Sequence, residues 1–151
     1  MADSLSQRPG FLIRRLHQIH LALFAEECER FGVTPVQFSI MTVARAQPRV
    51  EQTQLAHEIG VDRTTLANVL ARLEGRGLVT RVVSSADRRL KLVSLTASGE
   101  TTLAAMTEAA ERAHARTIEA LPEPARAAFL EALAELVKAG NGHGRAPMRL
   151  A

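Results

Sequence analysis

Side chains that can hydrogen-bond to nucleic-acid bases and phosphates recur at helical spacing between residues 63 and 72: Arg63, Thr64, Thr65, Asn68 and Arg72. Arginine can donate two hydrogen bonds to guanine, asparagine pairs with adenine, and threonine can donate to a phosphate or contact the methyl group of thymine. The opposite face is aliphatic and predicts burial, with Leu66, Val69, Leu70 and Leu73. Any amphipathic helix has such a solvated face, so this pattern alone leaves a purely structural interpretation open.

A second group of charges lies in the polar turn at residues 84–89. Two β-biased runs, 78–83 and 90–95, flank this turn and predict a hairpin. Arg88 and Arg89 at its tip have no apolar role, and arginine suits a narrow minor groove with its enhanced negative potential. Asp87 is expected to pair with a neighbouring guanidinium and orient it, without adding much stability. A polar helix followed directly by a basic hairpin points to DNA binding more specifically than either feature alone.

Short helices must position these side chains. A predicted helix over 51–58, the turn at Gly60 and a helix that Asp62 caps form a helix-turn-helix, whose second helix ends near 75–77. Such a unit buries one face of its second helix and presents the other to a major groove. Gly32, Thr34 and Pro35 predict that a first helix over 9–31 stops and a second one runs to Ala46.

Long apolar helices flank this unit. The helix over 9–31 has two apolar faces, which fits either a well-buried helix or one that also packs against a second subunit. Thr96 or Ser98 caps a helix that runs to Ala120, and prolines then precede a last helix over 124–139. That last helix cannot bury its apolar stripe alone, which favours a homodimer.

Charge and composition narrow the function classes. The formal net charge is +3, yet residues 60–91 hold seven cationic and three anionic side chains, as a polyanion-binding surface requires. The single cysteine, Cys28, excludes an intramolecular disulfide and fits a reducing compartment. The sequence shows neither a signal-peptide pattern nor an apolar run of membrane-spanning length. We therefore expect a cytoplasmic protein without a membrane partner.

Three segments resemble the MarR family of transcriptional regulators: Thr34 to Phe38, Gln54 to Val79, and Asp87 to Gly99. The resemblance spans residues 9–139, and the hairpin motif is its most specific part. It implies a mainly α fold with a small β-hairpin, namely a winged helix-turn-helix with interlocking N- and C-terminal dimerisation helices. The implied organisation is a disordered N-terminus (1–8), dimerisation helices (9–34 and 98–139), a DNA-binding domain (35–97) and a flexible tail (140–151).

The resemblance also implies a homodimeric DNA-binding regulator, with repression favoured, whose partner is a palindromic operator in double-stranded DNA. In this family an arginine of the wing enters the minor groove, and the resemblance implies this role for Arg88 first and for Arg89 second. The contacts of the recognition helix pass to Arg63, Thr64, Thr65 and Asn68. Asn68 stands where many members have arginine.

Members of the family commonly release DNA when a small aromatic acid binds between the dimerisation helices and the winged helix. His17 and His20 share one face of the first helix, with Arg14 and Arg15 close by, and a cation beside an apolar wall can hold an aromatic carboxylate. Opposite helices would contribute Phe38, Met41 and His114. Nicotinate or hydroxynicotinate is the first choice, followed by benzoate, hydroxycinnamate or their coenzyme A thioesters. Alternatively, the histidines only cap or cross the dimer interface.

Other classes fit less well. Cys28 could signal by oxidation, but Glu27 and Glu29 disfavour its thiolate and the chain has no tyrosine, so a packing role is favoured. A metal site from His17, His20 and His114 lacks a spacing signature. We expect that the protein is not an enzyme and binds no cofactor, since the sequence shows neither a phosphate-binding loop nor a nucleophile–base arrangement. A winged-helix protein-interaction module often lacks the basic wing that Arg88 and Arg89 provide here.

Overall fold

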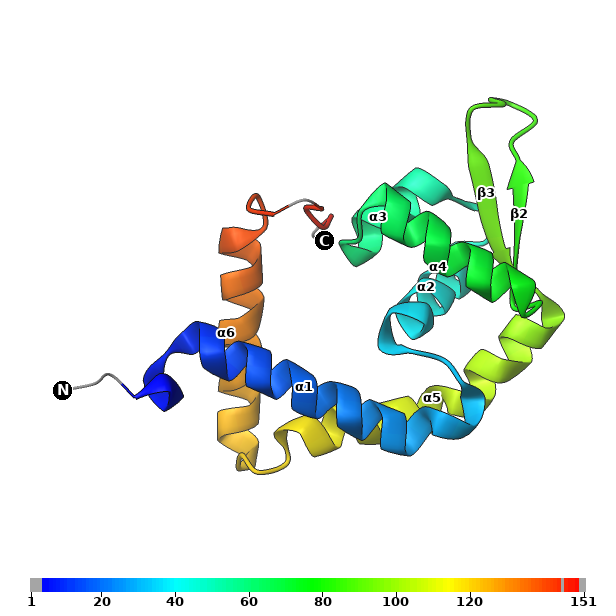
Figure 1. Ribbon diagram of the computed structural model, residues 1–151. Helices are drawn as coiled ribbons and strands as arrows, with labels where there is room; N and C mark the ends of the chain where they lie inside the picture. Colours follow the sequence, from blue (N-terminus) through cyan, green and yellow to red (C-terminus); the bar gives the residue numbers. More distant parts are fainter. Residues whose placement is uncertain (1–3, 145, 150–151) are drawn as a thin grey trace.

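Helices make up most of the computed structural model, which describes residues 4–144 and 146–149 (Figure 1). The helices are α1 (Pro9–Cys28), α2 (Pro35–Ala46), α3 (Gln52–Ile59), α4 (Arg63–Gly75), α5 (Ala97–Ile118) and α6 (Glu123–Gly140). The strands are β1 (Val50–Glu51), β2 (Val79–Val83) and β3 (Lys91–Leu95), and short 3-10 turns, η1 and η2, span Leu5–Gln7 and Glu29–Phe31. The predicted order of helices and hairpin is confirmed. The turn at Leu5–Gln7 lies within the segment expected to be disordered, of which residues 1–3 are outside the described residues.

The helices begin where the sequence supplies a cap. Gly32 adopts the left-handed conformation (φ 61°), which ends the α1–η2 run. Thr34 then opens α2 with a reciprocal capping box, in which its Oγ1 accepts from Gln37 N–H at 3.2 Å and Gln37 Oε1 accepts from Thr34 N–H at 3.0 Å. Asp62 caps α4 and Thr96 caps α5 in the same position. Local sequence therefore sets where the recognition helix starts.

The sheet has one strand more than the predicted hairpin. Strand order is β1-β3-β2, with both pairings antiparallel. Val93 at the centre of β3 lies opposite Arg81 on one side and opposite Val50 on the other. Arg49, just before β1, has a positive φ of 62°, and its backbone N–H donates to Ser94 Oγ at 3.1 Å. The base of the wing is thus fixed on both edges of β3.

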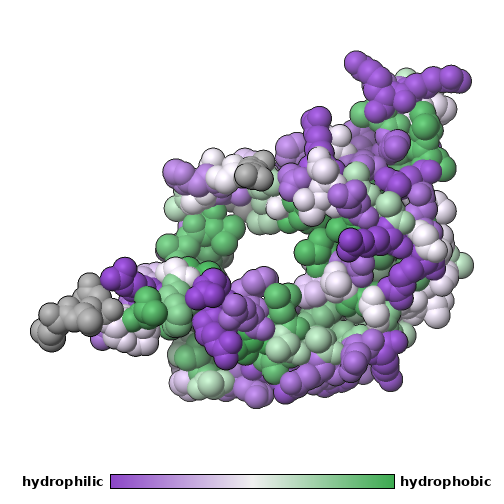
Figure 2. All heavy atoms as spheres, in the orientation of Figure 1, coloured by the Kyte–Doolittle hydropathy of each residue, from purple (hydrophilic) through white to green (hydrophobic). Residues whose placement is uncertain are grey.

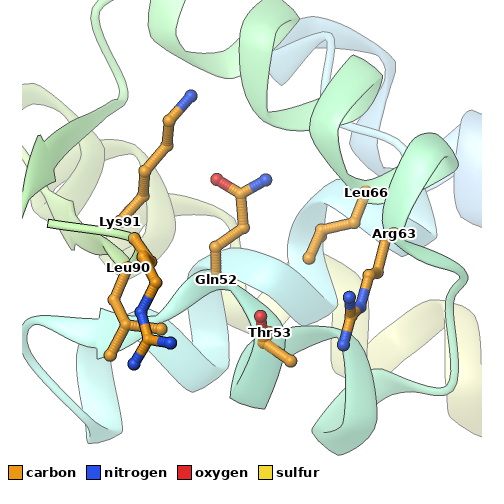
Figure 3. Close-up of a pocket in the computed structure, with 7 residues that line it drawn as sticks. Gln52, Thr53, Arg63, Leu66, Leu90 and Lys91 are labelled. Carbon is orange, nitrogen blue, oxygen red and sulfur yellow. The ribbon is translucent and has the colours of Figure 1, made fainter. Parts of the chain in front are cut away.

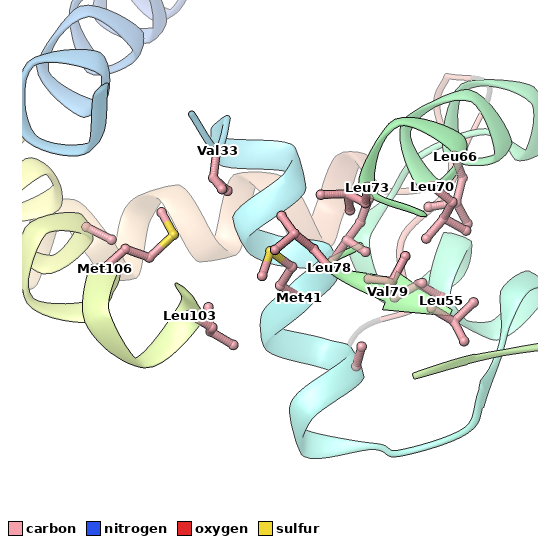
Figure 4. Packing of buried hydrophobic residues seen from close by; sticks show 14 of the residues in the cluster. Val33, Met41, Leu55, Leu66, Leu70, Leu73, Leu78, Val79, Leu103 and Met106 are labelled. Atoms are coloured by element: carbon pink, nitrogen blue, oxygen red, sulfur yellow. The ribbon is translucent and has the colours of Figure 1, made fainter. Parts of the chain in front are cut away.

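One apolar core joins the carboxyl end of α1, the helix-turn-helix, the sheet and α5, and Figure 4 shows part of it. Leu66, Leu70 and Leu73 are fully buried, as their spacing predicted. They meet side chains from the other elements that are also fully buried, among them Ile40, Met41, Leu55, Val93 and Leu103. Burying one face of α4 in this way leaves the opposite face to solvent.

The remaining helices form an elongated layer. α1 lies along α5, and in the view of Figure 1 α6 runs across the direction of α1. α6 has no buried residue in the described chain, and Leu130, Leu136 and Val137 on it are exposed. Leu12 and Ile13 on α1 are exposed too. Figure 2 shows an opening between α6 and the winged helix, with apolar side chains along its walls.

After α6 the chain turns back toward α3. The Asn141 side chain accepts from Met148 N–H at 2.9 Å and donates to Met148 O at 2.6 Å. The backbone N–H of Arg149 donates to His57 O at 2.6 Å. This segment was predicted to be a flexible tail, and its residues 145, 150 and 151 are outside the described residues. No helix in the described part of the chain is long and apolar enough to cross a membrane.

Candidate nucleic-acid interface and ligand pocket

The polar face of α4 is open to solvent. The structure places all five of its predicted contact residues on the exposed side: Arg63, Thr64, Thr65, Asn68 and Arg72. Thr65 has a second role, because its backbone N–H and its hydroxyl both donate to Asp62, at 2.9 and 2.7 Å. These hydrogen bonds, the backbone one first, lower the pKa of the Asp62 carboxyl. The hydroxyl of Thr65 is therefore committed to the cap, whereas Arg63 and Asn68 point outward from the same turn and the next.

The tip of the wing holds one arginine in a fixed direction. Arg89 donates from Nε and a terminal nitrogen to the two oxygens of Asp87, at 3.0 and 2.8 Å, while 88% of its side chain is exposed. The Arg89 side chain is the main reason that the pKa of Asp87 is lowered. Ser84 Oγ accepts backbone hydrogen bonds from Ala86 and Asp87, which braces the turn. Sequence analysis favoured Arg88 for the groove, but the ion pair orients Arg89.

A cleft of about 170 Å³ lies between α3, α4 and the wing (Figure 3). Three cationic side chains line it, Arg63 from α4 and Arg89 and Lys91 from the wing. Gln52 and Thr53, at the start of α3, also line it, as do Leu66 and Leu90. Gln52 Oε1 is buried without a hydrogen-bond partner among the described residues. Sequence analysis did not single out Gln52 and Thr53 as contacts; their place in the first turn of the helix before the recognition helix was the available signal.

Aromatic rings gather where α1, α2 and α5 meet. The imidazoles of His20 and His114 stack with centroids 5.0 Å apart, and Phe24 meets both edge-on. Phe38 from α2 continues the cluster, with its ring 6.1 Å from that of Phe24. His20 Nδ1 is hydrogen-bonded to Thr117 Oγ1 at 2.8 Å. Three predicted pocket residues, His20, Phe38 and His114, therefore come together, and Phe24 and Thr117 join them.

The surroundings of His20 disfavour its protonated form. Burial lowers its pKa, and the neighbouring His114 and His17 lower it further. Beside this cluster, Phe38 and His114 line a cavity of about 360 Å³, whose wall also includes apolar side chains and the polar Ser39, Thr42 and Glu58. The aromatic rings suit a small aromatic ligand, whereas the Glu58 carboxylate in the wall means that an acid would need a cation beside it.

The other predicted ligand contacts lie elsewhere. Met41 is fully buried in the core and is not among the residues that line this cavity, so its role as a ligand contact stays a prediction. Arg14 lies over the ring of Phe11, 5.5 Å from its centroid, and Arg15 contacts Gln18 at 3.4 Å. Both arginines and His17 are exposed on α1 and do not line the cavity within one subunit.

Cys28 has the properties of a packing residue. Its side chain is 1% exposed, and burial, assisted by the nearby Glu27, raises the pKa of its thiol. A redox sensor needs the opposite shift and an accessible sulfur. Metal binding gains no support either, since the described residues contain no group of three potential His, Cys, Asp or Glu ligands.

Comparison with known proteins decides the family. The family model for "MarR family" matches residues 33–91, which include α2, the helix-turn-helix and the start of β3. The transcriptional regulator HosA of Escherichia coli O127:H6 is 40% identical over 93 residues, which cover 62% of this chain and 67% of HosA. The chain belongs to the MarR family.

Solved structures of MarR-type regulators agree with the fold. The transcriptional repressor CouR, bound to a 23-mer DNA duplex, is 33% identical with a TM-score of 0.83, covering 91% of this chain and 97% of CouR. BpsR of Bordetella bronchiseptica, whose DNA binding is regulated by 6-hydroxynicotinic acid, is 28% identical with a TM-score of 0.84, covering 90% of this chain and 97% of BpsR. The winged helix-turn-helix fold is confirmed, and the protein is a transcriptional regulator, a class that is not enzymatic.

Proposed function

We propose that this MarR-type regulator binds a palindromic operator as a homodimer and represses transcription until a small aromatic carboxylic acid releases it. The observation that carries the proposal is the junction of the exposed α4 face with a wing whose Arg89 is held outward by Asp87. The likeness to CouR, which was solved on a DNA duplex, supports the same use of these elements.

In this proposal each basic element meets a different part of the duplex. α4 enters the major groove, where Arg63 and Asn68 read base edges. Arg89 enters the adjacent minor groove, and Asp87 reduces the entropy that its side chain would otherwise lose on binding. Between the two grooves, Lys91 and the start of α3 hold the DNA backbone in the cationic cleft.

The second subunit follows from the exposed apolar surface. Leu12 and Ile13 on α1, and Leu136 and Val137 on α6, are between 48% and 65% exposed. A monomer in water rarely leaves a patch of this kind uncovered. A two-fold dimer with one winged helix-turn-helix on each subunit requires half-sites about one turn of the DNA helix apart, roughly 34–36 Å.

The effector is assigned to the cavity beside the aromatic cluster. An aromatic ring of the hydroxynicotinate or benzoate class would lie against Phe38 and His114. Its carboxylate needs a cation, for which Arg14, Arg15 and His17 on α1 are the candidates. The relationship to BpsR and its 6-hydroxynicotinic acid favours the pyridine acids.

The decisive experiment measures DNA affinity against salt. Operators are selected from a random duplex library, and dissociation constants are then determined by fluorescence anisotropy at several salt concentrations. We expect Arg89→Ala to weaken binding at least tenfold and to reduce the salt slope by about 1. Arg88→Ala is the matched control, which removes an equal charge that Asp87 does not orient.

The same duplex tests the effector. A panel of nicotinate, 6-hydroxynicotinate, benzoate and hydroxycinnamate is titrated into the complex, and one acid should release the DNA at micromolar concentration. Failure of the wild-type protein to select any sequence, or equal losses in the Arg88 and Arg89 variants, would refute the proposed interface. Release by none of the acids would refute only the effector.

A further inference from the structure

An arginine of the recognition helix caps the end of α1. The α1–η2 run stops at Gly32, so the last carbonyl groups of that run have no donor within the helix. Arg76, the C-cap residue of α4, donates from its two terminal nitrogens to Gly32 O at 2.6 Å and Phe31 O at 2.9 Å. A cation at this end of a helix is also favoured by the helix dipole. The carboxyl end of α4 is thereby bound to the end of α1.

The next two residues bind the start of α5. Thr96 donates from its hydroxyl to Gly77 O at 2.6 Å and from its backbone N–H to Leu78 O at 3.1 Å. Residues 76–78 are therefore tied to both long helices of the outer layer. At its amino end, by contrast, the hydrogen bonds that hold α4 are the local ones between Asp62 and Thr65.

The geometry of Arg76 suits a fixed angle between helices. A guanidinium group is planar and presents its donors in a rigid fork, so two simultaneous hydrogen bonds define a direction as well as a distance. Lysine would preserve the charge but present a point donor. The Arg76 side chain is exposed, so water screens its charge and the orientation matters more than the stability it adds.

We propose that Arg76 is a positioning residue, which sets the angle of α4 relative to α1 and α5 and thereby the half-site spacing that the dimer accepts. The inference rests on the proposed function, because spacing has meaning only for a dimer on a palindrome. A change of one base pair moves a half-site by about 3.4 Å and rotates it by about 35°. Two winged-helix domains held at fixed angles cannot follow such a change, whereas domains that have lost the Arg76 hydrogen bonds can.

The test compares duplexes that carry the selected operator with its natural spacing, with one base pair added, with one removed, and with a single half-site. Anisotropy measurements use wild type, Arg76→Gln, Arg76→Lys and the control Arg30→Gln. Arg30 is an exposed cation at the same end of α1, over the ring of Phe31, so its loss removes equal charge without removing the cap.

We expect wild type and Arg30→Gln to prefer the natural spacing by tenfold or more, and Arg76→Gln to discriminate by less than about threefold. Affinity for the single half-site should stay within about twofold of wild type in every variant, and Arg76→Lys should fall between. Unchanged spacing preference in Arg76→Gln, or an equal loss on the half-site, would overturn the inference.

Thermal melting of each variant accompanies the binding data. Should Arg76→Gln be unfolded, Arg76→Lys decides, because it keeps the charge and loses only the fork. A wild-type protein that binds no duplex refutes the proposed function, and the inference falls with it. A wild type that binds and discriminates, beside an Arg76→Lys variant that discriminates equally, refutes the inference alone.

Discussion

Gly99, near the start of α5, allows this helix to approach the backbone at Leu78, just before β2, more closely than any other residue would permit. A Cβ atom added there would lie 2.1 Å from the backbone oxygen of Leu78 and 3.3 Å from Leu95 Cδ2. Real Cβ atoms stay at least 3.0 Å from such an oxygen, so Gly99→Ala must open the contact by about 1 Å. Helix propensity alone predicts the opposite sign, since alanine stabilises a helix by about 1 kcal/mol relative to glycine.

The magnitude follows from what the displacement breaks. Overpacking a tight contact costs about 1–3 kcal/mol. The shift also stretches the hydrogen bonds that Thr96 donates to Leu78 O and Gly77 O, each worth about 0.5–1.5 kcal/mol. After the gain in helix propensity, we expect a net loss of about 2–4 kcal/mol. In a chain of this size the loss lowers Tm by roughly 5–15 °C.

Calorimetry and circular dichroism melts at one fixed protein concentration measure the change, because the Tm of a dimer depends on concentration. Gly10→Ala is the matched control, since Gly10 is also helical and nothing lies within 4 Å of its added Cβ. We expect Gly10→Ala to melt at the wild-type temperature or slightly above. A Gly99→Ala variant as stable as wild type would refute the packing argument and leave propensity as the dominant effect.

Three further outcomes are expected. Thr34→Ala removes the side-chain half of the capping box and should cost about 1 kcal/mol, seen as a Tm lower by roughly 2–4 °C; no change would mean that Pro35 alone fixes the start of α2. The pKa of His20 is lowered in the folded protein, so stability is complete above its unfolded pKa of about 6.5 and falls as the pH drops below it. His20→Gln should make Tm depend less on pH in that range. A pH dependence of Tm equal to that of wild type would contradict the assignment. Hydrogen bonds from Arg112 and Arg116 lower the pKa of Glu27, so its contribution is present above about pH 4.3 and disappears as the pH falls through the folded pKa; Glu27→Gln should remove this acid-dependent part of the unfolding free energy, measured by denaturant titration.

Several elements could be predicted because their signals are local. The burial of Leu66, Leu70 and Leu73 follows from a period of 3.6 residues, and the starts of α2 and α4 follow from Thr34 and Asp62. Such signals need only a few neighbouring residues. They located the recognition helix and the wing, which carry most of the candidate interface.

What sequence analysis missed depends on contacts between distant segments. β1 has two residues, too few for an alternating pattern, and it exists because β3 has a free edge beside it. Likewise the sequence does not distinguish the adjacent Arg88 and Arg89, and the backbone conformation of the turn determines which of them pairs with Asp87.

The hydrogen bond from Arg149 N–H to the carbonyl of His57 has a practical consequence for anyone who labels this protein. A dye or purification tag attached at Arg149 would sit next to α3, within the footprint expected on the duplex, whereas η1, the first element of the described chain, lies away from α3 (Figure 1). A fusion at Arg149 would clash with DNA and would therefore weaken the measured affinity. Fluorophores are therefore better attached at the amino-terminal side, where their anisotropy reports the rotation of the protein without interfering with DNA binding.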